Sequence, residues 1–470
     1  MMPTVHSERF DNGHAGFGGY RTRIHPSRGI ATPAIHGGAV FFGGGFGSYD
    51  MYAVDQATGT LRWHVRTRDD GPTAAVVLDD VVLFNTESCT LVASEVTTGA
   101  VIWEKWLGDP LLAQPAAANG RVVMVYPAHG SHWLGAFNIR SGRQLWDCKV
   151  GHDVITAPVI ADGHVYVSTY DGAVSCVDMA TGQPRWTRPM NATSAPFVFD
   201  GRVYVAQRHA HDAAPANDVR RGSASGAHVW EQTSFVQAHD AVEVGSSPRK
   251  RAAYLSSEWG QQRKARYTQD DAAVGFAHAP AAAKMDSVRR LVGEAHVSRA
   301  FRFQGSRPTV SNGVLFETTG DRLEATDLAS GQRRWTWDDA RSEEGERRLT
   351  PPAVANDRVL VGTWDGRVIS FDALTGQVRW EVRVGAPCHW QPVMSGGRIF
   401  AGLEDGTLIA FETGDPKDDG WPMWGGGPAH NGPDADSASD VRVEPSLATT
   451  YTNENVPSAT IDPSAIPQTA

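Results

Sequence analysis

The chain has 470 residues, of which 41% are hydrophobic and 20% charged, and these proportions are typical of a globular protein. Its formal net charge of −10 argues against a surface built to bind nucleic acid or anionic lipid. The 49 glycines, 27 prolines and 15 tryptophans predict many tight turns and many large apolar anchors.

Residues 1–29 are predicted to form an N-terminal arm. Charged and polar residues occur throughout the first 25 positions, without the apolar run that a secretory signal peptide requires. No stretch approaches the 18 apolar residues of a membrane span. We therefore expect a soluble chain, cytoplasmic or of a compartment that the sequence does not name. The four cysteines lack metal-site or disulfide spacing and are expected to be buried thiols.

An internal repeat occupies residues 30–207 and 295–433. The string YAVDQATGTLRW at Tyr52–Trp63 recurs as SCVDMATGQPRW ending at Trp186 and as SFDALTGQVRW ending at Trp380. Less regular copies end at Trp103, Trp146 and Trp335. Neighbouring copies are 40–45 residues apart except across one interval of 149 residues, so further structure must lie between Trp186 and Trp335.

Each copy has the pattern of one blade of a β-propeller. Short apolar runs separated by Asp-Gly and Thr-Gly predict four antiparallel strands joined by tight turns. We expect the Trp to cover the edge of its own blade and to pack on the next one, and the Asp before Thr-Gly to cap a turn. With Phe301 and a last unit around Gly396–Asp405 added to the Trp anchors, the count predicts an all-β, eight-bladed propeller of four-stranded antiparallel blades.

A long insertion is predicted in the fifth blade. Residues 208–294 are expected to interrupt that blade after its second strand and to form a lid. Blades 1–4 and the first part of blade 5 are expected in residues 30–207. The rest of blade 5, blades 6–8 and the ring closure are expected in residues 295–433. Either residues 10–24 or, as we prefer, Trp421–Trp424 completes the last blade and closes the ring. Residues 434–470 are rich in Ser, Pro and Thr without periodicity and are predicted to be a flexible tail.

The unit Ala-x-Asp-x-x-Thr-Gly-x-x-x-Trp resembles the repeat of the pyrroloquinoline quinone (PQQ)-like β-propellers. That family includes quinoprotein alcohol dehydrogenases and outer-membrane assembly lipoproteins, so the resemblance implies the fold and leaves catalysis and protein docking both open. Trp421–Trp424 with Pro428–Gly432 also resembles a motif at the edge of such propellers. The chain lacks the adjacent Cys pair and the calcium ligands that the resemblance would require of a quinone enzyme, although Trp390 could serve as a floor for the quinone.

One face of the ring is predicted to carry the candidate site. In a four-stranded blade, the second-to-third-strand turns and the blade-to-blade connections emerge on the same face, and loops on a rigid scaffold often carry function. Residues before the innermost strands would then converge on the axial funnel and bind a ligand. The candidates are Gln114, His152, Asp153, Thr156, Arg307, Trp390 and Gln391, with Arg307 as the anchor for an anion and His389 as the catalytic proton-transfer residue.

Histidines on the same face suggest a metal as an open alternative. His129, His132, His209 and His211 have loop spacings that allow metal ligation, and the competing interpretation is that they are solvated or hydrogen-bonded. The leading hypothesis is a propeller that binds a small-molecule ligand or a protein partner on its loop face and axial funnel. The alternatives are a non-quinone enzyme acting on a small molecule in the lidded funnel, with or without a metal ion, and, less favoured, a PQQ-dependent dehydrogenase. The cofactor is unknown, and PQQ is not favoured.

Overall fold

The protein is described by a computed structural model. It describes residues 4–10, 16–25, 29–45, 47–69, 71–87, 89–108, 113–152, 154–155, 157–190, 192–208, 216–223, 228–235, 307–339, 349–432 and 458–460, of which 207–208, 216–223, 228–235 and 458–460 are described by their backbone alone. Short strands separated by turns follow one another throughout these residues, as expected from the alternation of β-branched runs with Asp-Gly and Thr-Gly.

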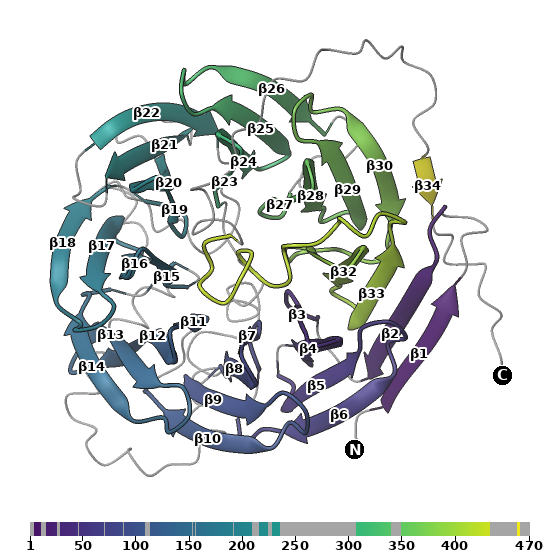
Figure 1. Cartoon of the computed structure of the whole chain (residues 1–470), viewed down its shortest axis with the longest axis horizontal. Coiled ribbons are helices and arrows are strands. Elements are labelled where there is room, and N and C mark those ends of the chain that lie inside the picture. Colours follow the sequence, from purple (N-terminus) through teal and green to yellow (C-terminus); the bar gives the residue numbers. More distant parts are fainter. Residues whose placement is uncertain are drawn as a thin grey trace, which may run out of the picture.

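Seven sheets each contain four strands that are consecutive in the chain, and they stand radially around a common axis (Figure 1). Their strands are β3–β6 (Ala34–His36, Ala39–Gly43, Asp50–Asp55, Leu61–Arg66), β7–β10 (Val76–Leu78, Val81–Asn85, Thr90–Glu95, Val101–Trp106), β11–β14 (Ala116–Ala118, Arg121–Ala128, Ser131–Asn138, Gln144–Lys149), β15–β18 (Val159–Ala161, His164–Ser168, Ala173–Asp178, Pro184–Pro189), β19–β22 (Phe197–Phe199, Arg202–Arg208, Ala216–Ser223, His228–Phe235), β23–β26 (Thr309–Ser311, Val314–Thr319, Arg322–Asp327, Arg333–Asp338) and β27–β30 (Ala353–Ala355, Arg358–Gly362, Arg367–Asp372, Val378–Arg383).

The remaining sheet closes the ring and is assembled from both ends of the chain. It joins β31 (Val393–Ser395), β32 (Arg398–Gly402) and β33 (Thr407–Glu412) to β2 (Gly19–His25) and β1 (Thr4–Phe10). β2 pairs antiparallel with β33, from Gly19 opposite Phe411 to Arg23 opposite Thr407. This pairing hides the strand edges that an open ring would expose.

The predicted ring of eight equivalent four-stranded blades is therefore wrong. Seven blades, not eight, are built from four consecutive strands, because the chain leaves the last sheet after its third strand. The closing sheet has five strands, and the sheet β27–β30 gains β34 (Ser458–Thr460), which pairs parallel to β30. β2, from the predicted N-terminal alternative, and not Trp421–Trp424, supplies the closing strand, since Trp421 bridges to Met394 on the innermost strand of the same sheet.

The expected interruption of the fifth blade after its second strand is also wrong. β21 pairs with β20 and β22 pairs with β21, so the blade is complete at Phe235. Trp230 lies opposite Arg221 in the register where Trp186 lies opposite Cys176, and it follows Trp186 by 44 residues, the normal repeat spacing. Trp230 thus stands at the backbone position expected of the missing anchor. The other predicted insertion residues, Phe301 and most of the predicted tail lie outside the described residues.

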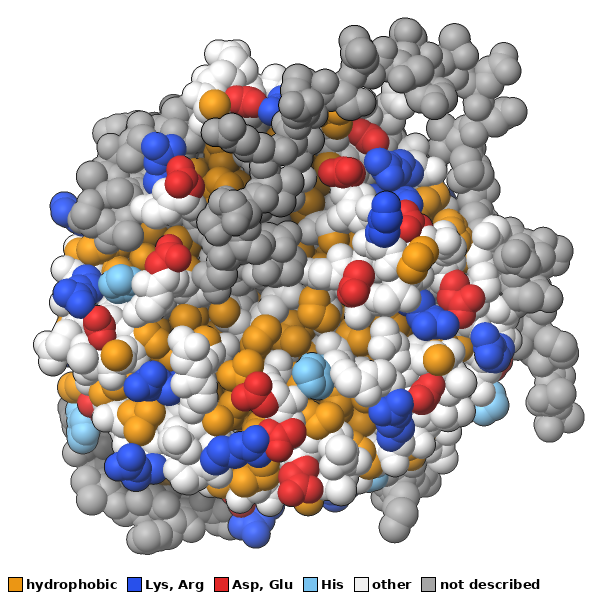
Figure 2. Space-filling view, viewed as in Figure 1, with side chains coloured by type: hydrophobic (Ala, Val, Ile, Leu, Met, Phe, Trp, Pro, Cys, Tyr) orange, Lys and Arg blue, Asp and Glu red, His pale blue; other side chains and the backbone are white. Residues whose placement is uncertain are grey.

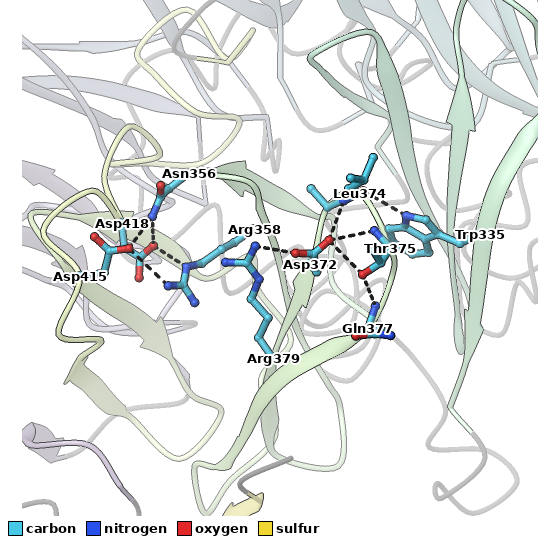
Figure 3. Close-up of polar contacts among 11 residues, drawn as sticks. Trp335, Asn356, Arg358, Asp372, Leu374, Thr375, Gln377, Arg379, Asp415 and Asp418 are labelled. Atoms are coloured by element: carbon cyan, nitrogen blue, oxygen red, sulfur yellow. Dashed lines mark hydrogen bonds and ion pairs between the residues drawn. The ribbon is translucent and has the colours of Figure 1, made fainter. Parts of the chain in front are cut away.

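The repeated Trp and Asp side chains hold the blades together, as the sequence predicted. The indole Nε1 of Trp63, Trp103, Trp146 and Trp335 donates to a backbone oxygen of the next blade at 2.8–3.0 Å. Figure 3 shows one such bond beside Asp372, whose carboxylate accepts from the backbone N–H and hydroxyl of Thr375 and from the guanidinium of Arg379. These contacts fix the turn between the third and fourth strands and leave neither residue type free for chemistry.

Buried apolar side chains fill the spaces between neighbouring sheets, and they include all four cysteines as free thiols. On the face seen in Figure 2, acidic and basic side chains are interspersed around the ring with hydrophobic ones between them. The residues that the structure describes include no helix long and apolar enough to cross a membrane.

Candidate functional site

The axis of the ring is occupied by residues 421–432, here called the axial segment. The chain reaches it directly after β33 and crosses the middle of the ring as the yellow-green trace in Figure 1. The approach is fixed by Asn356, whose Nδ2 donates to Asp415 at 3.0 Å and to Asp418 at 2.7 Å (Figure 3). Arg358 Nε lies 2.6 Å from Asp418 Oδ1, and the Asp418 side chain is fully buried. This ionic anchor, between β27 and β28, sets where the chain enters the axis.

The axial segment is bonded to the innermost strands of several blades. The backbone N–H at the middle of the inner strand donates to this segment from Ile35, Ala117, Ile160, Val198 and Met394 at 2.7–2.9 Å. In four of these bonds the acceptor is a backbone oxygen, and in the fifth it is the side chain of Asn431. Inner strands have no further strand on their axial side, so their N–H groups need such partners. The axial segment therefore closes the inner edges of the ring.

Gln391 has all its polar atoms committed to this packing. Its Oε1 accepts from Trp421 Nε1 at 3.2 Å and from the backbone N–H of Gly425 at 2.9 Å. Its Nε2 donates to the backbone oxygens of Pro351 and Pro352 at 3.4 and 2.9 Å. The neighbouring Trp390 is fully buried. Gln391, predicted to bind a ligand, thus holds the axial segment in place, and Trp390, predicted likewise, is buried beside it in the chain.

Arg307 lies at the same level of the ring but in a different electrostatic situation. It is fully buried, and its guanidinium carbon lies 4.8 Å from the ring centre of Trp424 and 5.6 Å from that of Phe197. Its hydrogen bond runs from Nη2 to the backbone oxygen of Pro196 at 3.4 Å, while Nε and Nη1 have no acceptor among the described residues. Burial lowers the pKa of Arg307 to about 9, so the group still carries its charge at neutral pH.

His430 is the second buried basic residue of the axial segment. Its Nδ1 lies 2.8 Å from the backbone oxygen of Trp424 and its Nε2 lies 2.8 Å from that of Pro115. Burial, and secondarily the charge of Arg307, lower the pKa of His430 to about 4. Pro115 follows Gln114, which is itself buried with Oε1 lacking a donor. The sequence had not marked Trp424 or His430 as site residues, although both lie in the quoted motif.

His389, the predicted proton-transfer residue, is enclosed at the outer end of the axis. Its ring meets Trp364 edge-on at 4.5 Å and Trp390 at 5.7 Å. Its Nε2 lies 3.1 Å from the carboxylate of Glu404, which is partly exposed. His152 has the analogous acidic neighbour in another blade, with Nε2 3.4 Å from Asp171. Both histidines are thus paired with a carboxylate of the second-to-third-strand turn of their own blade.

The metal hypothesis finds no centre among the residues that can be examined. His129 is exposed and meets Trp133 edge-on, whereas His132 is buried. His209 and His211 lie outside the described residues, as do Asp153 and Thr156. Within the described part of the chain, no three His, Cys, Asp or Glu side chains are placed to share a metal ion.

Comparison with known proteins agrees with this architecture. The family model described as outer membrane protein assembly factor BamB matches residues 47–147, 130–336, 214–411 and 319–439. BamB of Yersinia pestis is 24% identical over 202 residues, which cover 40% of this chain and 49% of the relative. Quinoprotein ethanol dehydrogenase of Pseudomonas putida is 30% identical over 132 residues, or 27% of this chain and 19% of that enzyme. The chain thus spans about half the length of the assembly-factor relatives it matches, and less of the enzyme.

Solved structures show the same fold at low sequence identity. BamB from Moraxella catarrhalis has a TM-score of 0.54 and 16% identity, covering 88% of this chain and 98% of its own. Quinohemoprotein alcohol dehydrogenase from Comamonas testosteroni has a TM-score of 0.54 and 13% identity, covering 88% and 76%.

A quinone does not fit the axis as it is built here. Trp421 and Trp424 are fully buried in it, and Gln391 has no hydrogen-bonding atom left for a cofactor. The fold and the family match do not depend on that cofactor, because the repeat residues serve the blades. The chain belongs to the PQQ-like β-propeller family, through the branch whose model is described as outer membrane protein assembly factor BamB.

Proposed function

We propose that this protein is a binding propeller that docks a protein partner on the face formed by the second-to-third-strand turns and the blade connections. The observation that carries this proposal is the axial segment. Residues 421–432 fill the axis and engage Gln391, so this residue, predicted to bind a small molecule, serves the fold instead. The face formed by the second-to-third-strand turns and the blade connections then remains as the surface where the ring can bind another molecule.

The turns on this face have a composition suited to protein contacts. Blades four and seven carry the equivalent turns Thr169–Gly172 and Thr363–Gly366, in which an aromatic residue precedes Asp-Gly. Trp364 is partly exposed at one of them. His152 exposes 46% of its side chain beside the other. Aromatic residues within a polar rim are typical of protein interfaces.

The relatives support docking as the class of function. Several matched proteins are named as outer membrane protein assembly factors, a name that describes work on other proteins. The quinone enzymes among the relatives agree with the propeller fold as well as the assembly factors do, but the filled axis does not suit a quinone cofactor. A shared propeller with a blocked axis favours the docking branch.

Site-specific photocrosslinking in cells tests the proposal. A photoreactive amino acid is placed at His152 and at Trp364 on the proposed face, and at Leu374 as the control. Leu374 exposes 68% of its surface and lies in a turn between third and fourth strands, at the opposite end of the blade. We expect both positions on the proposed face to capture one and the same protein, and Leu374 not to. Equal capture from all three positions, or none from His152 and Trp364, would overturn the proposal.

A point variant then tests whether the captured contact contributes binding energy. Trp364→Ala is expected to weaken binding of the purified partner by about tenfold or more, as for other buried aromatic anchors of interfaces. Leu374→Ala should bind normally. Thermal melting of both variants separates lost docking from lost folding.

A further inference from the structure

Arg307 is a buried cation for which the described residues supply no counter-charge. The chain contains a direct comparison in Arg367, which is equally buried but forms ion pairs with Asp339 and Asp365. Arg307 instead has aromatic rings on its faces, one backbone oxygen at 3.4 Å, and two nitrogens, Nε and Nη1, without acceptors. Buried charges in folded proteins are normally paired, because an unpaired one is costly to desolvate.

The residue stacked on Arg307 lacks an acceptor as well. Trp424 is 1% exposed, and its Nε1 has no hydrogen-bond partner in the described part of the chain. The corresponding nitrogen of Trp421, three residues earlier, donates to Gln391. Two touching side chains therefore present three nitrogens whose N–H groups lack acceptors among the described residues. All three are donors, so the group that would satisfy them must accept hydrogen bonds.

His430 also packs against Trp424, and its low pKa leaves it neutral at pH 7, so it supplies no counter-charge to Arg307. Its ring packs edge-on against Trp424 at 4.7 Å, and both of its nitrogens face backbone oxygens at 2.8 Å. A neutral imidazole donates through one nitrogen only, so the second contact is satisfied when the ring is protonated. Arg307 and His430 thus lie within the same closed axis, and among the described residues neither forms an ion pair with a carboxylate.

We propose that a compact oxyanion, such as a carboxylate, phosphate or sulfate group, binds inside the axis beside the stacked side chains of Arg307 and Trp424. Arg307 Nη1, which lies against the axial segment at Gly425, would donate to one of the oxyanion's oxygens in a charge-assisted hydrogen bond. Trp424 Nε1 would supply a second hydrogen bond. Gly425 belongs to the site as well, because a Cβ there would lie 2.2 Å from Arg307 Nη1. This site goes beyond partner docking and does not depend on it.

Anion titration of the purified full chain tests the site. Inorganic phosphate, sulfate and acetate are titrated against chloride at constant ionic strength, with binding followed by calorimetry and by the melting temperature. We expect at least one of them to bind saturably and to raise the melting temperature of the wild type. Arg307→Met should weaken that binding at least tenfold, whereas Trp424→Phe, which removes only the indole N–H, should weaken it by a smaller factor.

The control is Arg143→Met, which removes the same charge from an exposed position and should bind as the wild type does. In buffer without the oxyanions, Arg307→Met should melt no lower than the wild type, because it removes an uncompensated buried charge. If Arg307→Met does not fold, Trp424→Phe carries the binding test alone. The proposal fails if no oxyanion binds saturably, or if the foldable variants respond to the oxyanions as the wild type does.

Discussion

Gln391 and Arg307 occupy the same position in two different blades, yet they differ in how far their hydrogen bonding is satisfied. Each directly precedes the proline at the start of an innermost strand, and each is fully buried against the axial segment. Gln391 makes four hydrogen bonds there, whereas Arg307 makes one and leaves two nitrogens without acceptors. Gln391 thus fixes the axial segment, whereas Arg307 retains hydrogen-bond donors that a ligand inside the axis could use.

Gln391→Leu should strongly destabilise the fold. The substitution leaves Trp421 Nε1 and the N–H of Gly425 buried without an acceptor. We expect the free energy of unfolding to fall by about 2–4 kcal/mol, measured by denaturant titration. The matched control is Gln114→Leu at the equivalent position of the third blade, where Oε1 has no partner and the loss should stay below about 1 kcal/mol. Equal losses in the two variants would contradict this role of Gln391.

Asp418→Asn should loosen the entry of the axial segment. It leaves Arg358, whose side chain is 14% exposed, without its closest carboxylate. We expect the free energy of unfolding to fall by about 3 kcal/mol, since removal of one partner from a buried ion pair leaves the other charge unpaired. The exposed pair Arg140–Asp80 serves as the control, and Asp80→Asn there should leave the melting temperature unchanged. A normal melting temperature for Asp418→Asn would show that the anchor contributes nothing.

Trp335→Phe should remove a single contact between blades. The ring packing is largely kept, but the bond from Nε1 to the backbone oxygen of Ala373 is lost. We expect the unfolding free energy to decrease by about 1 kcal/mol beyond the loss of ring area. Trp337→Phe in the same strand is the control, because Trp337 packs on Phe371 and its Nε1 donates to none of the described residues. The two variants should differ by that amount in denaturant titrations.

Acidification should destabilise the protein through His430. With the axis free of added oxyanion, burial lowers the folded-state pKa to about 4 from an ordinary 6.5, so the unfolded chain binds the proton first. This contribution is complete above pH 6.5 and is lost as the pH falls towards 4, by about 3 kcal/mol in all. His430→Gln should show a smaller loss of stability over that interval. Parallel stability curves for the two proteins would rule out this assignment.

The sequence alone determined the type of fold because the blade is a local structure. Thr-Gly turns, Asp caps and one outer Trp recur within 40–45 residues, and each is satisfied inside its own blade or by the next one. Even the missed anchor, Trp230, lies at the expected distance from Trp186, so its identification needed only the spacing. The family resemblance followed from the same local signals.

Only the tertiary structure decided how the ring closes and what fills its axis. β2 and β33 are separated by almost the whole chain, and no local pattern shows that residues 19–25 pair with 407–412. Likewise, no local sequence pattern distinguishes Gln391, Arg307 and Trp424. Gln391 bonds to the axial segment and Arg307 stacks on Trp424 only because the axial segment passes beside their blades. Hydrogen bonding and desolvation depend on which groups are in contact, and these contacts form only when the ring closes.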